Sequence, residues 1–185
     1  MTTDEQLAKL AQQGSESAFS ELVERYQTRL LRFLLTRCAS RADAEDAIQD
    51  TFVNAYRYLH SYNSRWRFST WLYRIAIRNA ARQQRQEPAA AAEQGRDDRD
   101  PLTECIASSE RENLWLTAKN LLSPDAYSAM WLRYVEDMPV ADVARVLQRP
   151  MSWTKVTLMR ARRRLIRELA AEAAVSIRSE NYGQT

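Results

Sequence analysis

One stretch of the sequence concentrates arginine and aromatic side chains without any acid to balance them. Between Ser64 and Gln86 the chain has six arginines, four large aromatic residues and no aspartate or glutamate. Like charges repel one another, so this composition favours a site where an anion lies along the arginines. Arginines bind phosphates and aromatic rings stack on unpaired bases, which together indicate single-stranded nucleic acid. A solvated basic face and an anionic membrane surface are the alternatives.

The segment from Ser69 to Arg85 is amphipathic when it is plotted as a helix. Its apolar side consists of Leu72, Tyr73, Ala76, Ile77 and Ala80. The opposite side holds an arc of about 80° with Trp71 and four arginines, here called the arginine stripe: Arg74, Arg78, Arg82 and Arg85. No acid at i±3 or i±4 neutralises the stripe, so the sequence predicts one helix with a core face and a binding face.

A second basic stretch has the pattern of a helix-turn-helix. A short apolar stripe predicts its first helix: Val140, Val143, Ala144 and Leu147. The turn is "QRPMS", which lacks the glycine often found there, and Ser152 is placed to cap the second helix. From Thr154 to Arg167 there are six basic residues and no acid. Leu158, Ala161 and Leu165 face the core, while four arginines share an outer arc of about 100°: Arg160, Arg163, Arg164 and Arg167. This favours a helix that enters a DNA major groove over a plain three-helix packing motif.

The composition argues against catalysis and metal binding. Among 185 residues there is one histidine, His60, and the two cysteines, Cys38 and Cys105, have no CxxC spacing. No zinc site, nucleophile–base pair or glycine-rich phosphate loop can be assembled from these residues. We therefore expect no enzyme, no cofactor, no metal and no small-molecule substrate. The chain shows neither a secretory signal nor an apolar run of membrane-spanning length, which predicts a cytoplasmic protein without direct membrane insertion.

The positions of glycine and proline predict the architecture. They avoid the periodic segments, and strand-like alternation is hard to find, so we expect an all-α protein. The polar segment "EPAAAAEQGRDDRDP" predicts a flexible linker between two small helical domains. The expected divisions are a first domain at 1–87, a linker at 88–102, a helix-turn-helix domain at 103–170 and a C-terminal tail at 171–185. The tail has no assigned role; it extends the last helix or frays.

Two further amphipathic stretches precede the arginine stripe. One core stripe comprises Phe19, Leu22, Val23, Tyr26, Leu30, Phe33 and Leu34, and a second comprises Ala44, Ile48, Thr51, Phe52, Ala55 and Leu59. The far side of the second is acidic, with Asp43, Asp46, Gln49 and Asp50. This side is either a solvated face with a favourable helix-dipole placement or a docking face for a basic partner.

Three blocks of the sequence resemble a known family. "AEDAIQDTFVNAYRYL", "FSTWLYRIAIRNAAR" and "LSPDAYSAMWLRYVEDMPVADVARVLQRPMSWTKVTLMRARRRL" are similar to the bacterial sigma factors of the extracytoplasmic-function (ECF) group, of the sigma-70 type. The resemblance runs from about residue 18 to residue 168, and two unrelated blocks occur in the right order with the right gap. It implies a subunit that directs RNA polymerase core enzyme to specific promoters and assists DNA melting. A stand-alone helix-turn-helix regulator is the alternative, although no sensor domain is visible.

The resemblance also implies a role for individual residues. Asp46, Gln49 and Asp50 match the segment that docks on the core polymerase. The residues matched to the promoter's minus-ten element are Tyr62, Asn63, Arg65, Trp66, Trp71, Arg74, Arg78 and Arg82, among which Asn63 contacts a flipped base. Those matched to the minus-thirty-five element are Trp153, Lys155, Val156, Thr157, Arg160, Arg163, Arg164 and Arg167. An anti-sigma factor is a further partner that the resemblance suggests.

The chain departs from the family pattern at the start of the second recognition segment. Trp153 is bulky where a small hydroxyl residue is usual, and Thr157 stands where arginine is common. We therefore expect a promoter sequence that differs from the commonest one.

Overall fold

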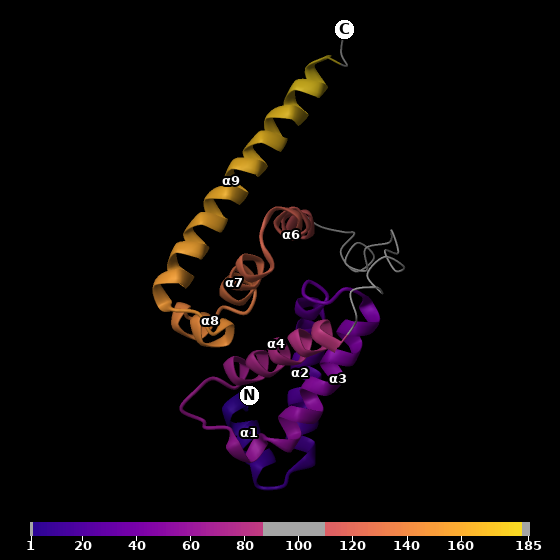
Figure 1. Cartoon of the computed structure of the whole chain (residues 1–185), viewed down its shortest axis with the longest axis vertical. Coiled ribbons are helices and arrows are strands. Elements are labelled where there is room, and N and C mark those ends of the chain that lie inside the picture. The colour runs from indigo at the N-terminus through magenta and orange to yellow at the C-terminus, as the bar shows by residue number, and fades with distance from the viewer. Residues whose placement is uncertain (1, 87–109, 183–185) are drawn as a thin grey trace.

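The protein was analysed as a computed structural model, which describes residues 2–86 and 110–182. These residues form helices and no strands, which confirms the all-α prediction (Figure 1). The first group, here called the N-terminal bundle, comprises α1 (Asp4–Gln12), α2 (Glu16–Leu34), α3 (Arg41–Arg57), the 3-10 turn η1 (Leu59–Ser61) and α4 (Phe68–Gln86). The C-terminal bundle comprises α6 (Glu110–Leu121), α7 (Pro124–Tyr134), α8 (Val140–Leu147) and α9 (Met151–Tyr182). The predicted linker, 88–102, and Cys105 lie outside the described residues.

The N-terminal bundle is built on the apolar faces that the sequence predicted. Leu22, Leu30 and Phe33 of α2 are almost completely buried, as are Leu72 and Tyr73 of α4. Helices α3 and α4 pack along one another, and the buried residues of α3 are all small: Ala44, Ala47, Thr51 and Ala55. Small residues allow close approach of the two helices, which fixes the direction of α4 and therefore of its arginine stripe.

A polar network also holds α3 against α4. The Asn79 amide donates to the Thr51 hydroxyl at 3.2 Å, and the Asn54 amide donates to Asn79 at 3.2 Å. Thr51 in turn donates to the Ala47 carbonyl at 2.6 Å, so the buried hydroxyl has both kinds of partner. A satisfied buried network of this kind favours one register between the two helices.

The C-terminal bundle contains the predicted helix-turn-helix. Helix α8 ends at Leu147, and Gln148 takes a left-handed conformation with φ of 54°. This position explains why glycine is frequent in such turns, because a side chain there is strained. Helix α9 begins at Met151, so the expectation that Ser152 precedes and caps it is wrong: Ser152 lies inside the first turn. The helix continues through most of the predicted tail, to Tyr182.

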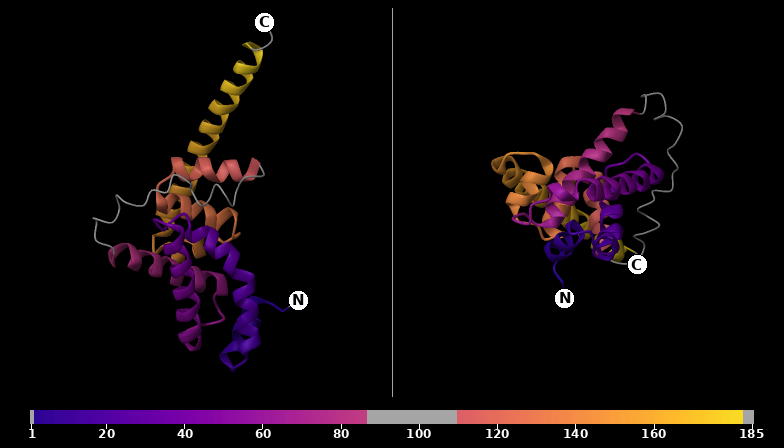
Figure 2. Two further views of the ribbon diagram at one scale, coloured as in Figure 1. Left: turned by 90° about the vertical axis from the view of Figure 1, so that its right-hand side faces the viewer. Right: turned by 90° about the horizontal axis from the view of Figure 1, so that it is seen from below.

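The two bundles are in contact. Helix α8 packs against α4, and the buried residues of both bundles form one continuous cluster. Figures 1 and 2 show α8 beside α4, with the C-terminal half of α9 projecting away from both bundles. The expected two-domain organisation therefore takes the form of two bundles that share an interface.

Candidate nucleic-acid interface

The arginine stripe lies on the exposed side of α4. Arg74, Arg78 and Arg82 are at least partly exposed, while Tyr73 and Ala76 on the other side are buried. Within the described part of the chain, no acid forms an ion pair with these three arginines. The side chain of Arg85, the fourth member, is outside the described residues. The stripe therefore keeps its charge available for an external anion.

A cavity of about 340 Å³ opens beside the N-terminal end of the stripe. This cavity, here called the loop cavity, is lined by Ser61, Tyr62, Asn63, Trp66, Thr70, Trp71, Arg74 and Arg145. Its volume is at the lower end of the range of small-ligand sites, and it combines aromatic walls with a few polar groups. Five of the predicted minus-ten residues meet here, whereas Arg65, Arg78 and Arg82 do not line it.

Asn63 is held by the loop that carries it. Its side-chain oxygen accepts the Arg65 backbone N–H at 3.0 Å, and its carbonyl accepts the Trp66 N–H at 3.0 Å. The oxygen is therefore engaged in a local turn, and the amide NH₂ is the half of the side chain left to donate. Trp66, with 46% of its surface exposed, stands at the same loop.

Aromatic packing supports the floor of the loop cavity. Tyr62 is buried, and its ring contacts Phe68 and Trp71 with centroid distances of 5.5 and 5.3 Å. Its hydroxyl donates to the Trp66 carbonyl at 2.6 Å, and burial raises the pKa of Tyr62 far above its usual value. Tyr62 therefore stays uncharged, lines the cavity with its ring and connects the loop to the core.

Thr70 was missed by the sequence analysis. It is 5% exposed and lines the loop cavity, and its hydroxyl has no hydrogen-bond partner within the described residues. A buried hydroxyl without a partner costs stability, so its retention needs an explanation. The sequence places Thr70 close to the start of the predicted helix, just after the loop, but it cannot show that the hydroxyl lacks a hydrogen-bond partner.

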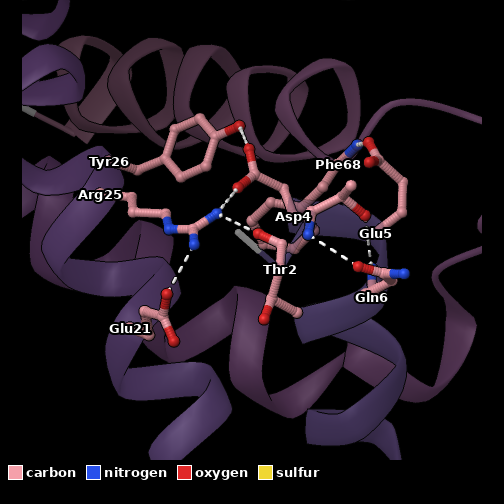
Figure 3. Close-up of polar contacts among 9 residues, drawn as sticks. Thr2, Asp4, Glu5, Gln6, Glu21, Arg25, Tyr26 and Phe68 are labelled. Carbon is pink, nitrogen blue, oxygen red and sulfur yellow. Dashed lines mark hydrogen bonds and ion pairs between the residues drawn. The ribbon is translucent and has the colours of Figure 1, made fainter.

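Helix α1 also contributes residues that the sequence analysis missed. The Gln12 amide donates to the carbonyls of Leu59 and Tyr62 at 2.8 and 2.9 Å, which ties α1 to the turn before Asn63. Glu5 accepts the backbone N–H of Phe68 at 3.1 Å, at the first turn of α4 (Figure 3). An acceptor at a helix N-terminus satisfies an otherwise unpaired donor, so α1 fixes both ends of the 59–68 segment.

Ion pairs hold α1 on α2. Asp4 accepts from Arg25 at 2.6 Å and from the Tyr26 hydroxyl, and Arg25 also pairs with Glu21 at 2.6 Å (Figure 3). The hydrogen bonds to Asp4 and Glu21 raise the pKa of Arg25, and burial followed by the bond to Asp4 raises the pKa of Tyr26. The whole of α1 is thereby fixed to the bundle that carries the loop cavity.

The acidic face predicted on α3 is accessible to a partner. Gln49 and Asp50 are exposed and Asp46 is exposed one turn before Asp50, whereas Asp43 is occupied in capping the helix through Ser40. Val53, three residues after Asp50, is 55% exposed and extends the face with an apolar contact. A face with acids and an exposed valine is suited to a partner helix that offers basic and apolar side chains. The sequence analysis did not single out Val53.

Helix α9 presents the second group of predicted residues. Thr154 and Leu158 are buried, whereas Lys155, Val156 and Arg160 are exposed on the outer side. Trp153 and Thr157 are half-buried, and Arg163, Arg164 and Arg167 continue the exposed basic surface along the helix. The Arg149 guanidinium lies 5.2 Å from the Trp153 ring centroid, so this arginine joins the same surface.

The described residues offer no metal site and no membrane span. They hold no cluster of three or more histidine, cysteine, aspartate or glutamate side chains suited to a metal ion. Within them, too, no helix has the length and apolarity needed to cross a membrane. Burial, and then the nearby Asp43 carboxylate, raise the pKa of the Cys38 thiol to about 11, so it stays protonated near neutral pH.

Comparison with known proteins accounts for both bundles. The family description "Sigma-70 region 2" matches residues 22–88, and "Sigma-70, region 4" matches residues 113–165. The ECF RNA polymerase sigma-E factor of Haemophilus influenzae is 35% identical over 175 residues, covering 86% of this chain and 92% of the relative. The chain belongs to the ECF RNA polymerase sigma factors. The RNA polymerase sigma-H factor of Pseudomonas aeruginosa, 31% identical over 86% of this sigma factor and 90% of its own length, is another relative.

A solved structure has the same arrangement of helices. The structure of CnrH in complex with the cytosolic domain of CnrY covers 91% of this sigma factor and 97% of its own chain, with a TM-score of 0.66 and 26% identity. The acidic face and all residues of the loop cavity except Arg145 fall in the region 2 match, whereas Arg145 and the helix-turn-helix fall in the region 4 match. Helix α1 precedes both matches, so the family motifs do not include Gln12 and Glu5.

Proposed function

We propose that this sigma factor reads the minus-ten element by holding one unpaired base in the loop cavity while the arginine stripe binds the strand beside it. The observation that carries the proposal is the loop cavity itself, because aromatic walls, the Asn63 amide and Arg74 converge there. Aromatic side chains stack on a base, an amide reads its edge, and arginines bind phosphates. Residues 1–87 form the minus-ten and polymerase-binding domain in this proposal.

The exposed side of α9 reads the minus-thirty-five element in the same proposal. Trp153, Lys155, Val156 and Thr157 lie at the N-terminal end of the helix, where recognition helices contact base edges. The four predicted arginines further along the helix bind phosphates: Arg160, Arg163, Arg164 and Arg167. Residues 103–170 form this second DNA-binding domain, with 88–102 as linker and 171–185 as tail.

The acidic face of α3 docks on the core polymerase. Asp46, Gln49 and Asp50 supply charge-assisted hydrogen bonds, and Val53 adds an apolar contact at the same surface. The partners are thus core polymerase and promoter DNA, and the protein acts in the cytoplasm without catalysing a reaction. An anti-sigma factor is a further partner in this proposal, since the related CnrH was solved in complex with a second protein, the cytosolic domain of CnrY.

Asn63 gives the sharpest test, because two substitutions separate its roles. Asn63→Asp keeps the side-chain oxygen that accepts from Arg65 but removes the amide donor, whereas Asn63→Ala removes both. Both variants should lose discrimination at one promoter position and keep it elsewhere. The measurement is open-complex formation with core polymerase, followed by a fluorescent base analogue across promoters with single substitutions. A uniform loss of activity over the whole set would contradict base reading by Asn63.

The arginine stripe has a different signature. Arg74→Ala should weaken binding to all promoters and reduce the salt slope by about 0.7 for each phosphate of the single strand that the variant no longer binds. The same should hold for Arg78→Ala. A wild-type salt slope in both variants would show that the stripe is a solvated face. A stand-alone regulator is distinguished by tight duplex binding in the absence of core polymerase.

A further inference from the structure

The hydroxyl of Thr70 is a buried polar group that the fold leaves without a hydrogen bond. Few buried side-chain polar atoms lack a partner within the described residues, and Thr70 Oγ1 is the one among them whose residue lines the loop cavity. The residue is only 5% exposed. A buried hydroxyl without a partner lowers stability, so its presence in the wall of a cavity points to a ligand that supplies the missing bond.

The bond that a helical threonine normally makes to its own backbone is not made by Thr70. Thr51, the other buried threonine of the N-terminal bundle, donates to the Ala47 carbonyl four residues earlier at 2.6 Å. The carbonyl four residues before Thr70 belongs to Trp66, and it accepts the Tyr62 hydroxyl at 2.6 Å instead. The loop that forms the cavity thus uses the acceptor nearest to Thr70, which leaves the threonine hydroxyl without its usual partner.

The other hydroxyls of the cavity wall are already engaged. The wall has three of them, on Ser61, Tyr62 and Thr70. Ser61 and Tyr62 each donate to a backbone carbonyl, at 2.7 and 2.6 Å. The Asn63 side-chain oxygen accepts a backbone N–H at 3.0 Å, so only its amide NH₂ is left for a ligand. Thr70 is therefore the hydroxyl of the wall that remains for a bound molecule.

Within the proposed site, and resting on the proposed function of the loop cavity, we infer that Thr70 is a specificity-determining residue whose hydroxyl contacts the captured base. The free half of the Asn63 amide can only donate, whereas a hydroxyl can donate or accept. The two side chains then read one base together: Asn63 meets an acceptor on its edge, and Thr70 meets a second polar atom of the same base.

One rotation brings the Thr70 hydroxyl to the base. In the free chain its oxygen is covered, although the residue itself lines the cavity. A threonine side chain in a helix adopts either of two rotamers, so turning about one bond exchanges the positions of its substituents without moving the backbone. Because the hydroxyl breaks no bond within the described part of the chain when it turns, the bond to the base is gained at little cost.

The position of Thr70 suits it to discriminate between bases. It lies in the first turn of α4, where Glu5 accepts the Phe68 N–H at 3.1 Å and the Trp71 ring packs 5.3 Å from that of Tyr62. A group on a rigid helix is held more precisely than one on a loop. A base whose edge does not match the hydroxyl is removed from water without a partner there, which penalises the wrong base.

Two substitutions at Thr70 separate the hydroxyl from the shape of the side chain. Thr70→Val replaces the hydroxyl by a methyl group of similar size and removes an unpaired polar group, so its melting temperature should equal or exceed that of the wild type. Discrimination at the promoter position that Asn63 reads should nevertheless fall about threefold to tenfold, the range of one neutral hydrogen bond. Thr70→Ser keeps the hydroxyl and should discriminate like the wild type.

Thr51→Val is the matched control, because it makes the same chemical change at the other buried threonine of the bundle. Thr51 donates to Ala47 and accepts from the Asn79 amide at 3.2 Å, so both bonds are lost in the variant. Its melting temperature should therefore fall. Its promoter preference should stay that of the wild type, because Thr51 does not line the loop cavity.

The assay is open-complex formation by each full-length variant with core polymerase on the promoters with single substitutions, with Asn63→Ala as reference. One further promoter has an abasic nucleotide at the position where Asn63→Ala loses discrimination. Without a base the hydroxyl has no partner on the DNA, so the wild type and Thr70→Val should form open complexes equally well on this promoter. A difference that persists there would show that Thr70 acts on the backbone or on the fold, which overturns the inference.

The outcomes distinguish the inference from the proposed function. If Thr70→Val discriminates like the wild type while Asn63→Ala does not, the assignment of Thr70 is wrong and the cavity still reads a base. If both variants discriminate like the wild type, the proposed function of the cavity fails. A melting temperature of Thr70→Val below that of the wild type, or an equal loss of activity on every promoter, would show an internal structural role and overturn the inference. Equal losses of discrimination in Thr70→Val and Thr70→Ser would also overturn it, because the hydroxyl would then not be the group that matters.

Discussion

Gln12 of α1 offers a direct test of how the loop cavity is positioned. Its amide donates to the carbonyls of Leu59 and Tyr62 at 2.8 and 2.9 Å, and both bonds are partly buried. Gln12→Ala removes both donors and leaves two carbonyls without those partners. At about 0.5–1.5 kcal/mol for each hydrogen bond, with the lower half of the range expected at a partly solvated site, the loss is about 1–2 kcal/mol.

This loss corresponds to a fall in melting temperature of about 2–8 °C for a chain of this size. Gln12→Glu should be more harmful than Gln12→Ala, because a carboxylate would face two carbonyl oxygens and donate to neither. The matched control is Gln13→Ala, one residue along the chain, whose exposed side chain makes no hydrogen bond to the described residues. Thermal unfolding by circular dichroism gives the stabilities.

Hydrogen exchange locates the effect. The amides of Tyr62 and Trp66 donate to Leu59 and Asn63 within the loop, at 3.0 Å in both cases. In Gln12→Ala these amides should exchange faster, while those in the middle of α2 should change only through global stability. Equal melting temperatures for the Gln12 and Gln13 variants, or unchanged exchange at the loop, would refute the idea that α1 positions the cavity.

Three other predictions concern the rest of the molecule. Asp46→Ala with Asp50→Ala should weaken core-polymerase binding by about 1.5–3 kcal/mol for each charge-assisted bond removed, measured by titration with core enzyme. Glu45→Ala is the control and should bind normally; intact binding of the double variant would refute docking. Stability should fall as pH rises above the unfolded thiol value near 9 toward the folded pKa of about 11, because the folded state retains the Cys38 proton that the unfolded state releases. In Cys38→Ala the free energy of unfolding, measured by urea unfolding, should fall less steeply with pH between these two values. A slope equal to that of the wild type would contradict this. Gln148→Gly should raise the melting temperature, because glycine adopts the left-handed backbone conformation with φ of 54° without strain, a gain of roughly 0.5–1 kcal/mol of stability; a decrease would show that the side chain has a compensating contact.

The buried and exposed sides of the helices in the site could be predicted, because the spacing of apolar residues within one helix determines which side faces the core. The buried and exposed sides of α4 follow from the positions of Tyr73, Ala76 and Arg78 in the sequence, and the structure agrees. The same holds for Leu158 and Leu165 in α9, which are buried. Which residues share one face of a helix depends only on their spacing in the sequence, so a prediction of the buried face holds wherever the helix forms.

The remaining parts of the site depend on pairs of residues that are far apart in the sequence. Gln12 bonds to carbonyls 47 and 50 residues away, and Glu5 bonds to an amide 63 residues away. No local pattern specifies such partners, because Gln12 looks like any polar residue at the end of a helix. The start of α9 shows the same limit on a smaller scale: Ser152 has the right residue type for a cap, but the helix begins at Met151.

The arginine stripe has an electrostatic cost in the free chain that a bound polyanion would remove. Arg74, Arg78 and Arg82 are placed on one side of α4 without an acid among the described residues to neutralise them, which raises the energy of the free chain. The neighbouring C-terminal bundle adds two more arginines beside this side, Arg145 and Arg149, each paired with an acid of its own bundle at 2.7 Å. Arg74, Arg78 and Arg82 stay exposed and are not neutralised by these neighbouring arginines, so their charge is available to a polyanion. A promoter strand that brings phosphates to the stripe therefore supplies the opposite charge that no described residue of the protein provides there.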